Sequence, residues 1–218
     1  PFPPRADGAH GAGAVTAPDR RRPRGRWLPL AVFGAIAVLL AAGVWLSRNP
    51  DRDALPSPLI GKPAPEFRLP VLHEPGRVVT SDELRGAPYL LNVWGSWCPG
   101  CREEHAVIDA FARTGGVQVI GYNWKDERAD ALRWLEQFGN PYWVVLVDYE
   151  GHNAIEWGIY GAPETFLVDA EGIVRWKHVG PMTDDTVRER LLPALEAIRS
   201  RHPGLPVEVE VLRHRQRE

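Results

Sequence analysis

The chain has 218 residues, of which 44% are hydrophobic and 25% are charged, a balance that excludes an intrinsically disordered protein and a membrane protein with many spans. Its two cysteines exclude a disulfide-dense scaffold and a zinc site of four thiolates, and its formal net charge of −2 gives no reason to expect a nucleic acid as partner. This length predicts one folded domain with additional segments, since a domain takes about 150 residues.

The chain begins with a basic arm, residues 1–26, which holds six arginines and two acidic residues and shows no apolar periodicity. We expect this arm to be disordered. An uncharged apolar run follows from Trp27 to Leu46, and as a helix its ~20 residues would span about 30 Å, the thickness of the hydrocarbon core of a bilayer. A core helix would show a polar face, which this run lacks. A signal peptide has a shorter apolar region, although the stretch Ala41–Gly43 leaves cleavage open. The sequence therefore predicts a transmembrane anchor over residues 27–46.

The basic residues lie mainly before this run, and the positive-inside rule then predicts a cytoplasmic N-terminus with the remaining chain on the outer side of the membrane. Residues 47–64 are rich in proline and predict a semi-rigid linker. The folded domain is expected over residues 65–202. The tail, residues 203–218, ends in charged residues and has no predicted role.

Strands and helices alternate through the expected domain. Tyr89–Trp94 is an apolar run typical of a strand that is buried on both faces. Further strands are predicted over Val117–Asn123, Val144–Val147, Thr165–Asp169 and Ile173–His178, the last two joined as a hairpin. Helices are predicted from Pro99 to about Ala112, over Glu127–Phe138 and over Asp184–Arg201, the last interrupted at Pro193. This alternation predicts an α/β fold with helices on both faces of a sheet.

Both cysteines lie in one tetrapeptide, Cys98-Pro99-Gly100-Cys101, between a predicted strand and a predicted helix. Cys98 would fall near the helix N-cap, where unpaired N–H groups and the positive end of the helix dipole stabilise a thiolate. It is therefore the expected nucleophile of disulfide exchange. Cys101, one turn further and more deeply buried, is expected to attack the mixed disulfide and release the product.

Two other roles fit this cysteine pair less well. A zinc site would need two further ligands, and no pair among the seven histidines has the spacing of a zinc finger. A structural disulfide that closes so short a loop would constrain the unfolded chain very little. A CxxC pair at a strand-to-helix junction outside the cytoplasm favours redox chemistry, so we expect no metal and no cofactor besides the redox-active pair.

A second segment, Gly158–Thr165, leads into a predicted strand through Pro163. A proline in such a place is a candidate for a cis peptide bond, and an ordinary trans bond is the alternative. A cis bond would leave the backbone of Ala162 free to pair with an extended peptide beside the cysteines.

Taken together, these motifs resemble thioredoxin-like proteins of the DsbE/CcmG type, which are membrane-tethered thiol reductases of cytochrome c maturation. The resemblance covers about residues 59–200 and rests on four blocks: Asn92–His105, Gly121–Asp126, Phe138–Tyr142 and Gly158–Phe166. It implies a thioredoxin-like fold, a central mixed sheet flanked by helices, and a cis bond before Pro163.

The resemblance also implies the roles of the site residues. Cys98 would be the attacking thiol and Cys101 the resolving thiol. Glu104 and Glu164 would be acidic groups near the redox centre, with a solvated helix face as the alternative for Glu104. Negative charge beside Cys98 would oppose the helix dipole, so we expect the pKa of its thiol to be less depressed than in strong oxidants, as suits a reductant.

Asn92 stands where thioredoxin itself carries a buried acid. Proton transfer to Cys101 is therefore expected to use another group or water. His105 lies one turn beyond Cys101 and is a further candidate for a redox role.

The implied function is a thiol–disulfide oxidoreductase that reduces the disulfide in the haem-attachment Cys-x-x-Cys-His segment of an apocytochrome c. The implied electron donor is a transmembrane thiol carrier of the DsbD or CcdA kind. The implied location is the bacterial inner membrane, with the catalytic domain in the periplasm. Two alternatives are a non-enzymatic adaptor that holds apocytochrome and a thioredoxin-fold peroxidase. Such peroxidases usually need a Thr-x-x-Cys sequence, whereas position 95 is Gly.

Overall fold

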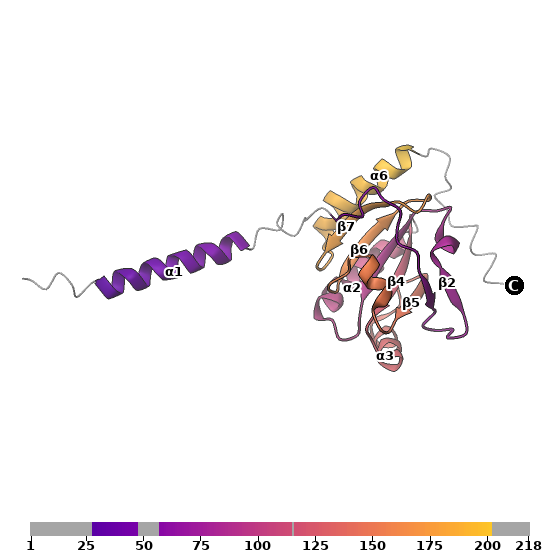
Figure 1. Ribbon diagram of the computed structural model, residues 1–218, viewed down its shortest axis with the longest axis horizontal. Helices are drawn as coiled ribbons and strands as arrows, with labels where there is room; N and C mark the ends of the chain where they lie inside the picture. Colours follow the sequence, from indigo (N-terminus) through magenta and orange to yellow (C-terminus); the bar gives the residue numbers. More distant parts are fainter. Residues whose placement is uncertain (1–27, 48–56, 115, 202–218) are drawn as a thin grey trace, which may run out of the picture. The chain divides into compact units, whose positions relative to one another are not determined.

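The structure is a computed structural model that describes residues 28–47, 57–114 and 116–201 (Figure 1). The chain divides into two units, residues 1–49 and 50–218. The expected basic arm, the first residue of the expected anchor, half of the expected linker and the C-terminal tail lie outside the described residues.

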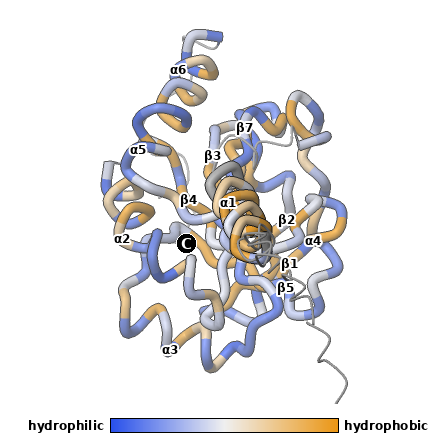
Figure 2. The backbone as a smooth tube through the Cα atoms, turned by 90° about the vertical axis from the view of Figure 1, so that its left-hand side faces the viewer, coloured by the Kyte–Doolittle hydropathy of each residue, from blue (hydrophilic) through white to orange (hydrophobic). Residues whose placement is uncertain are grey.

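The first unit contains one helix, α1, Leu28–Ser47, among its described residues. It is apolar along most of its length (Figure 2), and side chains such as Phe33 and Leu39 are exposed. Over the residues that the structure describes, we find no helix with the length and the apolar character needed to cross a membrane.

The second unit is built on a five-stranded sheet with the order β5-β4-β3-β6-β7. Its strands are β3 Tyr89–Trp94, β4 Gln118–Trp124, β5 Val144–Asp148, β6 Glu164–Val168 and β7 Val174–Val179. β3, β4 and β5 are parallel, whereas β6 and β7 are antiparallel to their neighbours. Parallel neighbours need a crossover, and α2, Pro99–Arg113, and α3, Arg128–Phe138, provide the two crossovers. The five predicted strands and the predicted helices are confirmed to within about one residue at most ends.

All six residues of β3 are buried, because both faces of the sheet are covered. Alternate side chains of a strand point to opposite faces. Leu90 and Trp94 pack in the cluster formed with α2, α3 and the C-terminal helix, whereas Leu91 and Val93 pack in a second cluster on the other face. That second face is covered by a two-stranded ribbon and a short helix, so helices lie on both faces, as predicted.

The elements that the sequence does not predict are the shortest ones. They are β1 Arg68–Pro70, β2 Val78–Thr80, the 3₁₀ turn η2 Ser81–Leu84 and α4 His152–Glu156. β1 and β2 pair antiparallel over three residues. Runs of three to five residues are too short to show a hydrophobic period.

The fold also begins earlier than the expected boundary at residue 65. The N–H of Gly61 donates to the carbonyl of Val174 at 2.8 Å, and that of Ala64 donates to Gly172 at 2.8 Å. Pro63 pairs with Ile173 in an isolated bridge. The last residues of the expected linker are thus bonded to the β6–β7 hairpin.

The C-terminal helical segment is interrupted, as predicted at Pro193. It consists of α5 Asp184–Thr186, a π-helical turn η3 Val187–Leu191 and α6 Leu192–Arg201. The N–H of Leu192 donates to the carbonyl of Val187, five residues back. Because Pro193 has no N–H for the next helical bond, the helix widens just before it.

Candidate active site

Cys98 and Cys101 form a disulfide at the N-terminus of α2, with their Cα atoms 5.3 Å apart. Cys98 is the N-cap residue, and its sulfur accepts the N–H of Cys101 at 3.1 Å. Pro99 occupies the first turn, where its missing N–H costs nothing. A thiolate on Cys98 would accept the same N–H and face the positive end of the helix dipole. The local geometry therefore favours Cys98 as the nucleophile.

Both cysteines are buried in this oxidised form, and the side chains of Cys98 and Cys101 are only 3% and 2% exposed. Cys101 is the more deeply buried of the two, as expected, but only by this small margin in the oxidised form. Cys98 borders a surface groove of about 660 Å³, whose lining includes Trp97, Arg102, Trp134 and Phe138. This groove is therefore the side from which a partner would approach Cys98.

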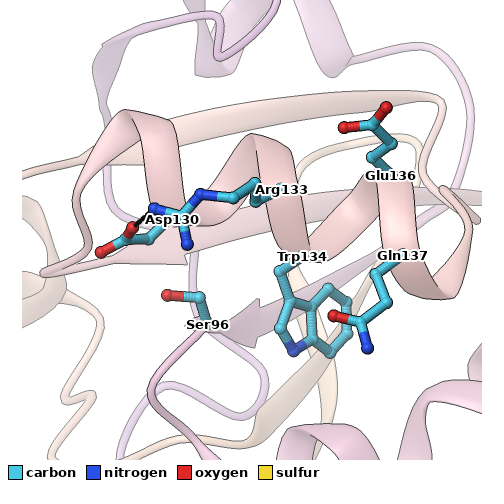
Figure 3. Close-up of a pocket in the computed structure, with 6 residues that line it drawn as sticks. All are labelled: Ser96, Asp130, Arg133, Trp134, Glu136 and Gln137. Atoms are coloured by element: carbon cyan, nitrogen blue, oxygen red, sulfur yellow. Dashed lines mark hydrogen bonds and ion pairs between the residues drawn. The ribbon is translucent and has the colours of Figure 1, made fainter.

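A neighbouring hollow of about 560 Å³ shares part of that lining. Figure 3 shows side chains of α3, among them Trp134 and Gln137, on one side of this hollow and Ser96 from the loop before the cysteines on the other. Ser96, Trp134 and Gln137 line both depressions. Both depressions thus border the short loop before Cys98, which contains Ser96.

The loop that leads into Cys98 is fixed by the turn between β4 and α3. A carboxylate oxygen of Asp126 accepts the N–H of Ser96 at 2.6 Å, and the other accepts its hydroxyl at 2.6 Å. The indole N–H of Trp97 donates to the carbonyl of Lys125 at 3.0 Å. A Cβ on Gly95 would lie 2.5 Å from the indole nitrogen of Trp97, so only glycine fits under this ring.

Pro163 lies next to the cysteine tetrapeptide, as expected. The Ala162–Pro163 peptide bond is cis, which confirms that prediction. A Cβ on Gly100 would lie 3.1 Å from Cδ of Pro163 and 3.1 Å from Cγ of Pro181. The carbonyl of Pro163 accepts the N–H of Gly180 at 2.9 Å. In the described part of the chain, the backbone of Ala162 makes no hydrogen bond.

Glu104 lies on the inner face of α2, three residues after Cys101, and is 1% exposed. The solvated position considered for it is therefore wrong. Its carboxylate accepts the side-chain amide of Asn92 at 2.8 Å and the backbone N–H of Met182 at 2.8 Å. Burial raises the pKa of Glu104 to about 7, and these two hydrogen bonds offset part of that rise.

Asn92 connects this carboxyl to the centre of the sheet. Its amide also donates to the hydroxyl of Thr165 at 3.1 Å, and its carbonyl accepts the hydroxyl of Tyr142 at 2.8 Å. Burial, and secondly the nearby charge of Glu104, raise the pKa of Tyr142 well above its usual value. A connected set of polar side chains thus lies inside the core beneath α2.

Glu164 follows Pro163 directly and is fully buried. Its charge is balanced, because a carboxylate oxygen lies 2.7 Å from the ammonium of Lys177. Within residues 57–114 and 116–201, no cationic side chain pairs with Glu104. Of the two predicted acidic groups, Glu104 is therefore the one whose carboxyl lies on the cysteine helix without a cationic partner within those ranges.

His105 contacts α3 rather than this polar set. Its ring nitrogen Nε2 lies 3.1 Å from the carbonyl of Phe138, and the ring meets Trp134 edge-on. Burial lowers its pKa. These contacts give His105 a packing role between the two helices.

The sequence does not point to several residues that shape the site. Asp126 bonds to Ser96, 30 positions away in the sequence, and the backbone of Met182 bonds to Glu104, 78 positions away. Lys177 pairs with Glu164 across a hairpin. The residue types alone do not reveal these partners. Within the described ranges, no cluster of three or more His, Cys, Asp and Glu side chains could hold a metal ion.

Comparisons with known proteins agree with this geometry. The Redoxin family matches residues 59–192. The thiol:disulfide interchange protein DsbE of Xylella fastidiosa (strain Temecula1) is 50% identical over 173 residues, covering 78% of this chain and 88% of the relative. The DsbE of Allochromatium vinosum is 51% identical over 166 residues, covering 76% and 90%. The DsbE of Escherichia coli K12 is 45% identical over 174 residues, covering 78% and 92%.

Among solved structures, a Chlorobium tepidum protein described as a DsbE thiol:disulfide interchange protein aligns with a TM-score of 0.53 at 30% identity. The alignment covers 62% of this chain and 97% of that one. A mixed sheet with a CxxC disulfide at a helix N-terminus defines a thioredoxin-fold thiol–disulfide oxidoreductase. The chain belongs to the Redoxin family and, within it, to the thiol:disulfide interchange proteins of the DsbE/CcmG type.

Proposed function

We propose that this thiol–disulfide oxidoreductase works as a reductase, and that its substrate is the disulfide in the haem-attachment Cys-x-x-Cys-His segment of an apocytochrome c. The observation that carries the proposal is the carboxyl of Glu104, which is buried on the inner face of the cysteine helix with no cationic partner among the described residues. Its negative charge opposes the stabilisation of a Cys98 thiolate by the helix dipole. A less stabilised thiolate makes the dithiol form a better electron donor.

The reaction follows from the two sulfurs. The Cys98 thiolate attacks one sulfur of the substrate disulfide, and the other substrate sulfur leaves as a thiolate and takes a proton. Cys101 loses its proton and attacks the Cys98 sulfur of the mixed disulfide. The substrate then leaves as a dithiol, and the enzyme holds the Cys98–Cys101 disulfide. Two electrons pass from the enzyme to the substrate, and a transmembrane thiol carrier of the DsbD or CcdA kind restores the dithiol.

Glu104 is the proposed proton acceptor for Cys101. The two residues share the inner face of α2, three positions apart. A group with a pKa of about 7 changes its protonation near neutral pH, as a general base of this step requires. The Asn92 amide holds the carboxyl in place.

Substrate binding is proposed to use the backbone of Ala162. This residue precedes Pro163, which borders the cysteine tetrapeptide at Gly100. Its N–H and carbonyl are without partners in the described chain, so they are available to an extended peptide. Pairing of this kind recognises a flexible segment through its main chain.

The two alternatives are distinguished by specific observations. The ring of Trp97 fills the space in which a threonine at position 95 would stand, which argues against a peroxidase that depends on such a threonine. A non-enzymatic adaptor would not need its cysteines. Full cytochrome c yield in cells carrying the Cys98→Ser/Cys101→Ser variant would favour the adaptor.

The decisive experiment measures electron transfer directly. The reduced protein is expected to reduce an oxidised Cys-x-x-Cys-His peptide, Cys98→Ser is expected to abolish this, and Cys101→Ser is expected to accumulate the mixed disulfide. A reduction potential of about −120 mV, as in strong oxidants, would contradict the proposal that the protein is a reductant. By linkage, the oxidised protein should also melt at a higher temperature than the reduced protein, whereas a strong oxidant shows the opposite order.

We further propose that the chain is tethered to the bacterial inner membrane, with its N-terminus in the cytoplasm and the catalytic domain in the periplasm. The support comes from the sequence: a basic arm precedes the apolar run Trp27–Leu46. A tether would hold the domain near both its proposed electron donor and its proposed substrate.

A further inference from the structure

A buried ion pair lies behind the segment that leads to Pro163. Glu164 on β6 and Lys177 on β7 meet across the hairpin, with 2.7 Å between carboxylate and ammonium. Their side chains are 0% and 8% exposed. Charges are rarely buried to this extent unless they are paired and hydrogen-bonded. The other hydrogen bonds of Glu164 and Lys177 therefore identify the segment of the chain that the pair holds in place.

The ammonium of Lys177 also lies over the ring of Phe166, 4.9 Å from its centroid, but the hydrogen bonds of the pair go to one short piece of backbone, residues 158–161. The second oxygen of Glu164 accepts the N–H groups of Tyr160 at 3.1 Å and Gly161 at 3.3 Å. The ammonium of Lys177 donates to the carbonyl of Gly158 at 3.0 Å and lies 5.2 Å from the ring centroid of Tyr160. One ion pair therefore fixes three backbone groups of this segment.

The next residue along the chain is Ala162, whose backbone has no partner within the described chain. After it, Pro163 borders Gly100 of the cysteine tetrapeptide. The position of the Ala162 backbone relative to the disulfide is thus set on one side by Pro163 and on the other by the segment that the ion pair holds.

We propose that Lys177 is a positioning residue for substrate binding, acting through Glu164 and residues 158–161 to hold the Ala162 backbone where an extended peptide disulfide pairs with it. This inference rests on the proposed function, which makes the Ala162 backbone the binding place, and it adds the residue that positions this backbone. Lys177 touches neither the cysteines nor the peptide, so its loss affects the binding of peptides and leaves the sulfur chemistry unchanged.

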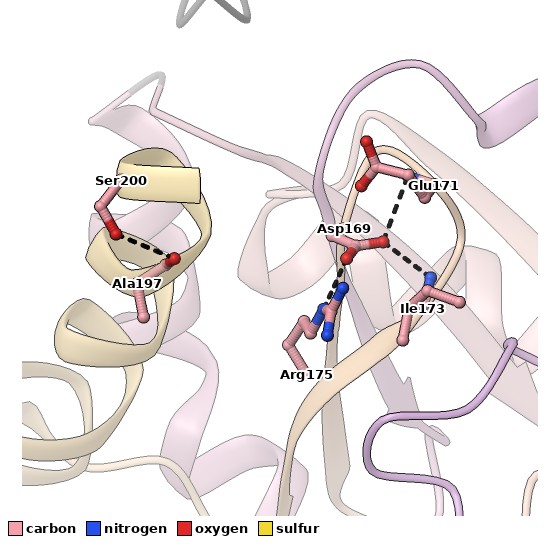
Figure 4. A network of polar contacts seen from close by, with 6 residues as sticks. All are labelled: Asp169, Glu171, Ile173, Arg175, Ala197 and Ser200. Atoms are coloured by element: carbon pink, nitrogen blue, oxygen red, sulfur yellow. Dashed lines mark hydrogen bonds and ion pairs between the residues drawn. The ribbon is translucent and has the colours of Figure 1, made fainter. Parts of the chain in front are cut away.

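The same hairpin offers a matched control at its other end (Figure 4). There, Asp169 pairs with Arg175 at 2.5 Å, and its other oxygen accepts the N–H groups of Glu171 and Ile173. This arrangement also joins a buried carboxylate, a cation and two loop N–H groups. It holds the β6–β7 turn, and neither Pro163 nor Gly100 is among its contacts.

The test compares variants that remove both charges of a pair, because removing one partner would leave an uncompensated buried charge and could unfold the protein. The variants are Lys177→Met/Glu164→Gln, the control Arg175→Met/Asp169→Asn, and the conservative Lys177→Arg. For each, KM and kcat are measured with the oxidised Cys-x-x-Cys-His peptide and with insulin. The reduction potential and the rate of exchange with dithiothreitol, which needs no backbone pairing, are measured alongside.

We expect Lys177→Met/Glu164→Gln to raise KM about tenfold for both substrates, with kcat, potential and dithiothreitol exchange unchanged. Lys177→Arg should stay within about twofold of the wild type, because it keeps the charge and a donor for Gly158. An unchanged KM in the first variant, or an equal rise in the control, would overturn the inference. Failure of the wild type to reduce the haem-attachment peptide would instead reject the proposed function, and the insulin series would still decide the role of Lys177.

Discussion

Among single residues, Glu104 shows best what the sequence can and cannot predict. An acid near the cysteines is visible in the sequence, but its environment is not. Glu104 is buried because it shares the inner face of α2 with Cys101, and it is tolerated there because Asn92 and the Met182 backbone bond to it. The strand position holds Asn92 rather than an acid, and the buried carboxyl beneath α2 is that of Glu104 on the helix itself.

The raised pKa of Glu104 makes a prediction for stability. An unfolded glutamate titrates near 4.5 and the folded one near 7, so the folded state holds one more proton between these values. The stabilisation is fully present below pH 4.5 and is lost as the pH rises through about 7. Urea unfolding of the oxidised wild type should show a loss on the order of 2 kcal/mol between pH 5 and pH 8 that Glu104→Gln lacks.

The matched control for this measurement is Glu103→Gln, since Glu103 is the exposed neighbour on the same helix. It should keep the pH dependence of the wild type. If Glu104→Gln retained the same slope, another group would carry the titration, and the assignment of Glu104 as proton acceptor would lose its basis.

Among the elements, the β4–α3 turn has the clearest influence on the redox centre. Asp126 bonds both the N–H and the hydroxyl of Ser96, and the Lys125 carbonyl receives the indole of Trp97. Lys125 takes a positive φ of 47°, which few residues other than glycine adopt. The turn therefore fixes the loop that covers Cys98.

Replacement of Asp126 tests this role. Asp126→Asn removes the charge from two short hydrogen bonds and should cost about 1–3 kcal/mol in denaturant unfolding. It should also speed alkylation of the reduced protein at Cys98, because the covering loop loosens. Asp130→Asn, an exposed change on the nearby helix, should stay within about 0.5 kcal/mol. Unchanged alkylation in Asp126→Asn would show that the turn does not control access to the sulfur.

The long elements of the fold could be predicted because their patterns are strong. The apolar run predicts β3, Pro99 predicts the start of α2, and the Gly-Asn-Pro sequence that ends in Pro141 predicts the end of α3. Each of these patterns is sufficient alone for its prediction. The ribbon β1–β2, the helix α4 and the pairing of Gly61 with the hairpin were not predictable, since each is short and depends on contacts with distant residues. The cysteines and Pro163 were predicted, whereas Asp126 and Lys177 were not, because only folding reveals their partners.

For the whole molecule, the open prediction is its place in the cell. The sequence predicts an anchor, a linker and an outward-facing domain, and this order follows from charge and hydropathy alone. When expressed with its full N-terminal region, the chain should sediment with membranes, and its catalytic domain should be accessible to protease from the periplasmic side. A chain that begins at Ser57, exported behind a cleavable signal peptide, should be soluble in the periplasm and keep its peptide reductase activity. Recovery of the full chain in the soluble fraction, with no earlier cleavage, would contradict the anchor.

The near-complete burial of Cys98 in the oxidised form bears on how the spent enzyme regains its electrons. A small thiol diffusing past meets little exposed surface of this residue, so we expect unspecific reductants to recharge the centre slowly. We expect a protein donor that docks in the groove beside Trp97 and Trp134 to bring its own thiolate to the side on which Cys98 borders that groove. In the proposed periplasmic location, where most thiols are being oxidised, such a fit would let the shape of the groove select the electron donor.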